Sequence, residues 1–390
     1  MNAHAVEVWR MAGGSAQRCG LAPKQADRLK WRQGEGGFSL KRLALEGSAL
    51  ASPVFTADGR MFCADRAGWA YGFDASRERL WQRALPAGVE AAPALSDDDQ
   101  TLFLATLGGD VLALETGSGE RIWKATIPSD RDPRIESDLL YHSPSGTVIA
   151  SSWAGEFIAL EAKTGTYAQR WQAGVRPRSA MAADESGWVY GMRVEWRDNH
   201  RGGTRLFRVN PTDGASETIY YEPSHTSIPG DLLQFASPII CGDWVIAIIN
   251  RNNDSRLYVF DLESEAHHQS ELIPTTFIAA PALLADQTLA LAGLDGQVYR
   301  LSLPQTELLQ TLDLEEDYLQ GAPVATAEGH LFIGTPTGDY YMIPIAPNGG
   351  GLSSPQQLLS DSRAFAGRAA FHPGGALVVP GSDHQIYWIE

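Results

Sequence analysis

The chain has 390 residues, of which 44% are hydrophobic and 20% charged, and its formal net charge is −16. This composition excludes a disordered chain, and the negative charge argues against nucleic-acid binding because it repels phosphate backbones. The N-terminus lacks the basic and apolar regions of a secretory signal, and no window approaches about 18 uninterrupted apolar residues, so we expect a cytoplasmic protein without a membrane span.

The first predicted element is a strand at residues 27–33, DRLKWRQ, which carries Trp31. From Leu50 onwards, a pattern of four short segments repeats about every 40–50 residues. Each repeat opens with a strand that carries a small residue before proline, as at Ser52-Pro53. A short apolar strand follows, and a short loop that often ends in glycine leads from it into an alternating strand. A Thr-Gly-like turn and a strand ending on an aromatic residue or leucine complete the repeat. Four short antiparallel strands at this period predict an all-β protein, a β-propeller.

Eight such repeats predict an eight-bladed β-propeller of four-stranded antiparallel blades, in a single domain over residues 1–390. The last repeat stops after its third strand. The strand at 27–33, within the leader 1–47, is therefore expected to join the C-terminal blade and close the ring. Irregular stretches at 175–222 and 344–363 leave seven blades as an alternative. The expected blades cover residues 48–87, 88–128, 137–174, 175–222, 233–274, 276–313, 318–358 and 363–390.

One repeat shows the pattern most fully: residues 109–123 read GDVLALETGSGERIW and end on Trp123. It recurs from Gly155 to Trp171 and, more loosely, from Gly68 to Trp81. The flat indole of each tryptophan is expected to pack between neighbouring blades. This pattern resembles the PQQ-like repeat superfamily over nearly the whole chain. The resemblance implies the fold and little of the function, because the repeated residues pack blades together.

Two branches of that superfamily differ in function. Quinoprotein dehydrogenases hold a quinone and Ca²⁺ on the propeller axis, and many carry adjacent cysteines. Here Cys19, Cys63 and Cys241 are isolated and no carboxylate-Asn cluster stands out, so we expect neither cofactor nor metal. The other branch is similar to the outer-membrane assembly lipoprotein BamB, a non-enzymatic scaffold of eight blades. Its lipoprotein signal is not found in this sequence.

The mouth of the axial channel is the first candidate site. We call the place of the proline near the start of each repeat the proline-like position, whether or not a proline occupies it. The residues three positions before it are expected to line the mouth: Leu50, Glu90, Tyr141, Arg178, Phe235, Ile278 and Gln320. His142 and Gln234 lie next to two of these residues in the sequence. The eighth position falls between Ala366 and Arg368. One interpretation is a solvated channel. The alternative is an enzyme, a lyase, isomerase or hydrolase, whose small anionic substrate contacts Arg176, Arg178, Glu90, Tyr141 and His142.

The fourth repeat is the second candidate site, because its segment 192–208 is long and rich in arginine. Guanidinium groups suit carboxylates and phosphates, so this repeat predicts an anion- or partner-binding site. The alternative is a solvated loop paired with Glu195, Asp198 and Glu185. The candidate residues are Arg176, Arg178, Arg193, Arg197, His200 and Arg201.

These observations favour a non-catalytic, monomeric scaffold that binds another protein at the rim of blades 3–5. Long loops at 129–142 and 222–235 flank blade 4 on both sides. When the other loops of a propeller are short, its long loops commonly contain the functional residues.

Overall fold

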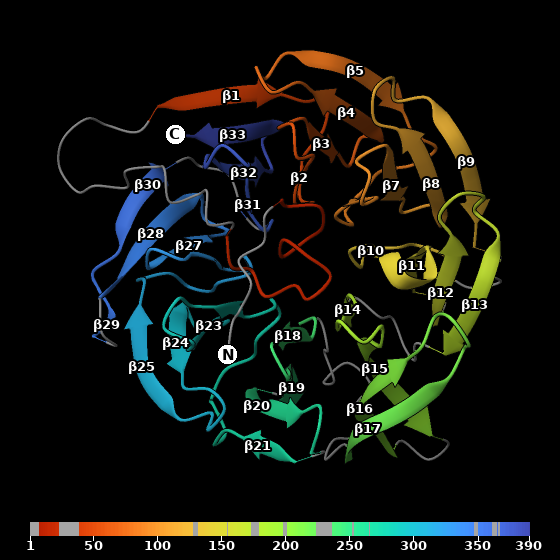
Figure 1. Cartoon of the computed structure of the whole chain (residues 1–390). Coiled ribbons are helices and arrows are strands. Elements are labelled where there is room, and N and C mark those ends of the chain that lie inside the picture. The colour runs from red at the N-terminus through yellow and green to blue at the C-terminus, as the bar shows by residue number, and fades with distance from the viewer. Residues whose placement is uncertain are drawn as a thin grey trace.

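The computed structural model describes residues 8–22, 39–127, 132–153, 155–172, 179–197, 201–223, 236–251, 253–264, 266–346, 350–360, 365 and 367–390, with only the backbone at 196, 197 and 201. Eight antiparallel sheets surround a central axis (Figure 1), which confirms the predicted eight-bladed β-propeller. Each of its blades has an innermost strand of two or three residues that faces the axis. The only helical turn in the described part of the chain is a short 3-10 helix, η2 (Ser143–Ser145).

The first four blades follow one another along the chain, and each is a meander of four neighbouring strands. Blade 1 comprises β2 (Val54–Phe55), β3 (Met61–Ala64), β4 (Trp69–Phe73) and β5 (Arg79–Ala84). Blade 2 comprises β6 (Ala94–Leu95), β7 (Thr101–Ala105), β8 (Asp110–Glu115) and β9 (Arg121–Thr126). Blade 3 comprises β10 (Leu140–His142), β11 (Thr147–Ser152), β12 (Glu156–Glu161) and β13 (Tyr167–Gln172). Blade 4 comprises β14 (Ala182–Ala183), β15 (Val189–Arg197), β16 (Arg201–Val209) and β17 (Ser216–Pro223).

The next three blades repeat this arrangement. Blade 5 comprises β18 (Ile239–Cys241), β19 (Trp244–Arg251), β20 (Asp254–Asp261) and β21 (His267–Gln269). Blade 6 comprises β22 (Ala282–Leu283), β23 (Leu289–Ala292), β24 (Gln297–Leu301) and β25 (Leu308–Asp313). Blade 7 comprises β26 (Val324–Thr326), β27 (His330–Gly334), β28 (Asp339–Ala346) and β30 (Gln356–Ser360), and β29 (Gly351–Leu352) pairs with the end of β28.

Blade 8 joins the two ends of the chain, as predicted. Its strands β31 (Ala370–Phe371), β32 (Leu377–Gly381) and β33 (Gln385–Ile389) are followed in the sheet by β1 (Leu40–Ala44). β1 pairs antiparallel with β33, from Leu40 opposite Ile389 to Ala44 opposite Gln385. The segment 27–33, expected at this place, lies outside the described residues, and β1 takes the position instead.

Tryptophans within the fourth strands, not at their ends as expected, contact the following blade. The indole Nε1–H of Trp81 donates to the carbonyl of Thr116 at 2.8 Å, and that of Trp123 donates to the carbonyl of Ala162 at 2.8 Å. A Cβ atom on Gly119 would lie only 2.6 Å from the Trp81 ring, so only glycine fits beneath it. The indoles therefore pack between blades as expected.

The N-terminal residues 8–22, which we call the axial segment, lie inside the ring, where Figure 1 shows them in red. Their backbone carbonyls accept hydrogen bonds from innermost strands of six blades. The donors are the amides of Phe55, Leu95, Ala183, Ile240, Leu283 and Ala325, and the acceptors are Trp9, Arg10, Ala16, Gln17, Cys19 and Gly20, at 2.8–3.0 Å.

The other two blades contact the axial segment through side chains. In blade 3 the amide of Tyr141 lies 3.3 Å from the sulfur of Met11. In blade 8 the buried ring of Trp9 packs edge-on against Phe371, with 5.8 Å between ring centroids. The innermost strands have one unpaired edge facing the axis, and the axial segment satisfies it.

Candidate functional site

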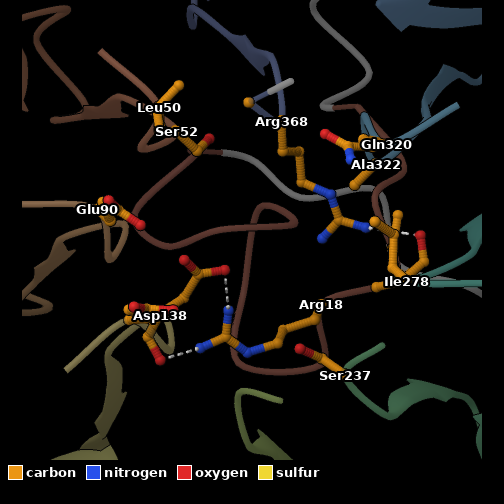
Figure 2. A pocket seen from close by; sticks show the side chains of 14 residues that line it. Arg18, Leu50, Ser52, Glu90, Asp138, Ser237, Ile278, Gln320, Ala322 and Arg368 are labelled. Atoms are coloured by element: carbon orange, nitrogen blue, oxygen red, sulfur yellow. Dashed lines mark hydrogen bonds and ion pairs between the residues drawn. The ribbon is translucent and has the colours of Figure 1, made fainter. Parts of the chain in front are cut away.

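An axial pocket of about 270 Å³ lies at the mouth of the channel, and the axial segment contributes Arg18 to its wall (Figure 2). Residues from the loops that lead into the innermost strands line it, as the sequence predicted for Leu50, Glu90, Ile278 and Gln320. The structure thus brings four of the expected mouth residues together. Arg176, Arg178, His200, Gln234 and Phe235 lie outside the described residues, and their predicted roles stay predictions.

Tyr141 and His142 do not lie at the mouth, which corrects their expected placement. The Ser143-Pro144 pair follows the innermost strand β10 instead of preceding it, and it forms η2. Tyr141 therefore sits within the strand, where its ring stacks on Phe103 at 5.7 Å between centroids. His142 is buried with its Nδ1 2.6 Å from the hydroxyl of Ser145, and burial lowers its pKa.

Blade 3 can be aligned with blade 1 by comparing the hydrogen bonds that their innermost strands make with the axial segment. This alignment identifies the blade 3 residues that stand at the mouth in place of Tyr141 and His142. The amide of Tyr141 faces the axial segment as that of Phe55 does in blade 1. Glu136 is thereby equivalent to Leu50, and Asp138 is equivalent to Ser52. Both acidic residues line the axial pocket.

Arg18 is the first pocket residue that the sequence did not reveal. It is 1% exposed, and its guanidinium donates to the carbonyls of Met181 at 2.6 Å and Leu139 at 2.8 Å. Its Nη1 lies 3.6 Å from Oδ2 of Asp138, as the dashed line in Figure 2 marks. Burial lowers the pKa of Arg18 and the Asp138 carboxylate raises it. Its φ of 57° lies in the left-handed region, a strained conformation for arginine.

Arg368 reaches into the same pocket from the loop before β31 (Figure 2). Its Nη2 lies 3.4 Å from the carbonyl of Ala280 and 3.5 Å from that of Pro281, at the outer limit of hydrogen bonding. Its Nε is buried and has no hydrogen-bond partner among the described residues. The pKa of the Arg368 guanidinium is lowered to about 10, chiefly because the group is buried; the Asp138 carboxylate opposes this lowering and the Arg18 guanidinium adds to it.

No sequence signal located Arg18, because residues 8–22 show no strand or helix periodicity. The sequence predicted either Ala366 or Arg368 at the eighth mouth position. It could not decide between them because the last repeat lacks the proline that marks the position in other repeats. The structure aligns Arg368 with Ser52, directly before the proline-like position.

Among the blade 4 arginines whose side chains the structure describes, Arg193, Arg205 and Arg208 are held in ion pairs. Nη2 of Arg193 lies 2.9 Å from one oxygen of Glu195, and Nε of Arg205 lies 2.7 Å from the other. Only the backbones of Arg197 and Arg201 are described; they pair at the last register position of the β15–β16 hairpin, and the predicted binding roles of these two residues stay predictions. The pairing with Glu195 agrees with the alternative of a locally paired loop, although two guanidinium groups share this one carboxylate.

The quinone and Ca²⁺ of the dehydrogenase branch do not fit the axis of this chain. The axial segment crosses the channel where hydrogen bonds reach it from the innermost strands. Within the described ranges no three His, Cys, Asp or Glu side chains lie close enough together to hold a metal ion. Cys19, Cys63 and Cys241 are buried free thiols, and burial raises the pKa of each.

No helix in the described residues combines the length and hydropathy needed to cross a membrane.

Solved structures similar to this chain come from both branches. BamB from Moraxella catarrhalis superposes with a TM-score of 0.72 at 15% identity, covering 90% of this chain and 99% of that one. A europium-containing methanol dehydrogenase gives a TM-score of 0.76 at 11% identity, covering 98% of both chains. Quinohemoprotein alcohol dehydrogenase from Comamonas testosteroni gives 0.75 at 12% identity, covering 100% of this chain and 81% of that one. At these identities the likeness concerns the fold alone.

A search of curated protein sequences found no match. A family model described as outer membrane protein assembly factor BamB, of the PQQ-like propeller type, matches residues 28–220 and 67–311, well over half of the chain. The tryptophan contacts between blades and the ring closed by β1 agree with that match, and the chain therefore belongs to this PQQ-like, BamB-type propeller family.

Proposed function

We propose that this chain is a non-catalytic scaffold that binds a partner protein on the mouth face of the propeller, at the rim of blades 3–5. The observation that carries the proposal is the length of two hairpins. The second strands of blades 4 and 5, β15 and β19, have 9 and 8 residues. The second strands of the other six blades have 4 to 6 residues.

The extra length places protein surface on the face that carries the axial mouth. The innermost strand of each blade runs away from the mouth and the second strand returns, so the loop between second and third strands lies on the mouth face. Three additional residues in a strand add about 10 Å. The hairpins of blades 4 and 5 therefore stand above the neighbouring loops and form a ridge beside the mouth.

The side chains on this ridge suit protein recognition. The guanidinium of Arg205 lies over the Tyr221 ring at 4.7 Å, and Glu195 fixes both Arg205 and Arg193. Arginine and tyrosine held in one geometry are common at the centres of protein interfaces. The group of Arg193, Arg205 and Glu195 has one more positive than negative charge, although the whole chain has a net charge of −16. A local positive charge of this kind favours an acidic partner.

The family gives independent support for a scaffold. Its description, an outer membrane protein assembly factor, is that of a protein that works on other proteins. The same description does not support the cytoplasmic location expected from the sequence. The enzyme alternative has less support, because Tyr141 and His142, two of its predicted lining residues, lie away from the axial pocket.

The experiment compares two double variants as bait in extracts of the native host. Arg193→Gln with Arg205→Gln removes the two ridge cations that pair with Glu195. Arg79→Gln with Arg83→Gln, on the exposed outer strand β5, is the matched control. We expect a partner that the wild type and the control capture equally and that the ridge variant retains at least about tenfold less, by quantitative mass spectrometry and then by Kd with the purified partner.

Circular dichroism and thermal unfolding of both variants should show that the fold is intact. Equal capture by the ridge variant and the control would place the partner surface elsewhere. Capture of no protein above background would contradict the scaffold itself.

A further inference from the structure

The eight blades offer an internal comparison of the residue directly before the proline-like position, which we call the neck position. Six of these residues are serine or alanine: Ser52, Ala92, Ala180, Ser237, Ala280 and Ala322. The two exceptions are Asp138 in blade 3 and Arg368 in blade 8, and both line the axial pocket. A small neck residue suits a position where eight loops converge, so the two charged residues need another explanation.

Asp138 has partners that account for its charge. One oxygen accepts a hydrogen bond from the amide of Ala92 at 2.8 Å, and the other lies 3.6 Å from Arg18. The remaining carboxylates of the pocket are also paired. Glu90 lies 2.8 Å from Arg66, and Glu136 lies 3.7 Å from Arg134.

Arg368 has no such partner within the described residues. Among them, no carboxylate lies within ion-pair distance of its guanidinium, and the only hydrogen bonds that it makes are the two long ones to the carbonyls of Ala280 and Pro281. Two guanidinium groups, those of Arg18 and Arg368, thus lie near the single carboxylate of Asp138. An unpaired cation taken out of water is costly unless an anion completes its surroundings.

The axial segment is shaped to admit this side chain. A Cβ atom on Gly13 would lie 2.6 Å from Nη1 of Arg368 and 2.7 Å from the backbone carbonyl of Arg18, and the φ of Gly13 is 76°, so only glycine fits here. The guanidinium thereby rests against the backbone of the axial segment and can present its buried Nε and the rest of its planar fork to a ligand. Planar forks of this kind bind carboxylates through two parallel hydrogen bonds.

The mouth end of the pocket carries a negative charge and hydrogen-bond acceptors instead of a cation. Glu90 supplies acceptors, and the exposed amide of Gln320 supplies both a donor and an acceptor. A second anionic group would be repelled by Glu90, whereas hydroxyl groups can donate to it. About 270 Å³ is at the small end of ligand pockets. The ligand should therefore be small, anionic at the end that reaches Arg368 and hydroxylated at the other.

We infer that the axial pocket is a binding site for a small hydroxylated carboxylate, such as a sugar acid, whose carboxylate pairs with Arg368 and whose hydroxyl groups contact Glu90 and Gln320. This inference goes beyond the scaffold function and does not depend on it, since the ridge variants leave the pocket unchanged.

The probes are D-gluconate and D-glucuronate, with D-glucose as the uncharged control and inorganic phosphate as an anion without the hydroxylated chain. Isothermal titration of the full chain should show saturable binding of at least one sugar acid, and at least about tenfold weaker binding of glucose and phosphate. Arg368→Met should weaken sugar-acid binding by about tenfold or more, because an ionic hydrogen-bonded contact is lost. Arg368→Lys should retain part of it. Arg170→Gln, an exposed arginine paired with Glu156, is the matched control and should bind as the wild type does.

The melting temperature without ligand gives a second readout that a structural role would not produce. If Arg368 serves a ligand, Arg368→Met replaces an unpaired cation by an apolar side chain and raises Tm. If Arg368 held the fold together, the same change would lower Tm. Lower Tm with unchanged binding would overturn the inference, as would the absence of binding by both sugar acids or binding of phosphate as tightly as gluconate.

Discussion

The tryptophan within a fourth strand stabilises two blades at once. Trp123 is 8% exposed, and its indole donates to the carbonyl of Ala162 in the Thr-Gly turn of the next blade. A Cβ atom on Gly165 of that turn would lie 2.6 Å from the Trp123 ring, so the ring and the glycine are in close contact. The large apolar ring is therefore buried at the boundary between two blades, and its one polar atom makes a hydrogen bond across that boundary.

Trp123→Ala should lower the free energy of unfolding by about 3–5 kcal/mol, because it leaves a cavity and an unpaired carbonyl between blades 2 and 3. Ile122→Ala, one residue earlier and 52% exposed, is the control and should cost about 0.5 kcal/mol or less. Urea unfolding followed by circular dichroism measures both. Equal losses in the two variants would show that the indole contributes nothing beyond its own strand.

These residues could be predicted because their signal is local. A tryptophan, an alternating strand and a Thr-Gly turn stand at fixed spacing, and the repeat shows the same spacing several times. Tyr141 and His142 were misplaced for the same reason. Ser143-Pro144 has the same sequence pattern, a small residue before proline, that precedes the innermost strand in other repeats. In the structure it lies after the innermost strand and belongs to η2. The pairing of β10 with β11 and the hydrogen bond from the amide of Tyr141 to Met11 show that Tyr141 and His142 belong to the innermost strand.

At the scale of elements, the axial segment is the feature that strand periodicity could not predict. It forms no strand of its own, and it contacts six blades through backbone carbonyls, which every residue type possesses. A contact made by the backbone leaves little trace in the choice of side chain. The side chains that do matter, Trp9 and Arg18, are single residues without a repeat to mark them.

Removal of residues 1–22 should therefore lower stability strongly. Six backbone hydrogen bonds and the buried ring of Trp9 are lost, at a combined cost of roughly 5 kcal/mol or more. A synthetic peptide of residues 1–22 added in trans should raise the Tm of the truncated chain in a concentration-dependent way.

A peptide of the same composition in scrambled order is the control for that rescue. A truncated chain that melts at the temperature of the full chain would show that the axial segment is dispensable. Rescue by the scrambled peptide would show that the effect is not specific to the contacts described.

At the scale of the whole molecule, the ring has no terminal blade. In an open array of repeats the end units have one neighbour and fray first. Here β1 and β33 join the two ends of the chain within blade 8, and the axial segment contacts all eight blades. Each blade thus has two neighbours and a shared centre. We expect thermal unfolding of the intact chain to be a single cooperative transition.

The closing strand gives the means to test this cooperativity. Leu43 in β1 is 6% exposed and packs in a cluster with residues of blades 1, 7 and 8, whereas Leu40 in the same strand is 43% exposed. Leu43→Asp places a charge in that cluster and should release β1, which costs about 3 kcal/mol or more. Leu40→Asp adds the same charge at an exposed position of the same strand and should leave the transition unchanged.

Calorimetry separates lost stability from lost closure. With the ring intact, the calorimetric and van't Hoff enthalpies should agree. In Leu43→Asp the blades beside the break become terminal, so the van't Hoff enthalpy should fall below the calorimetric one and a low-temperature shoulder should appear. A Leu43→Asp protein that melts earlier but still in one two-state transition would mean that closure by β1 adds stability without coupling the blades, and the axial segment alone would then have to account for their cooperativity.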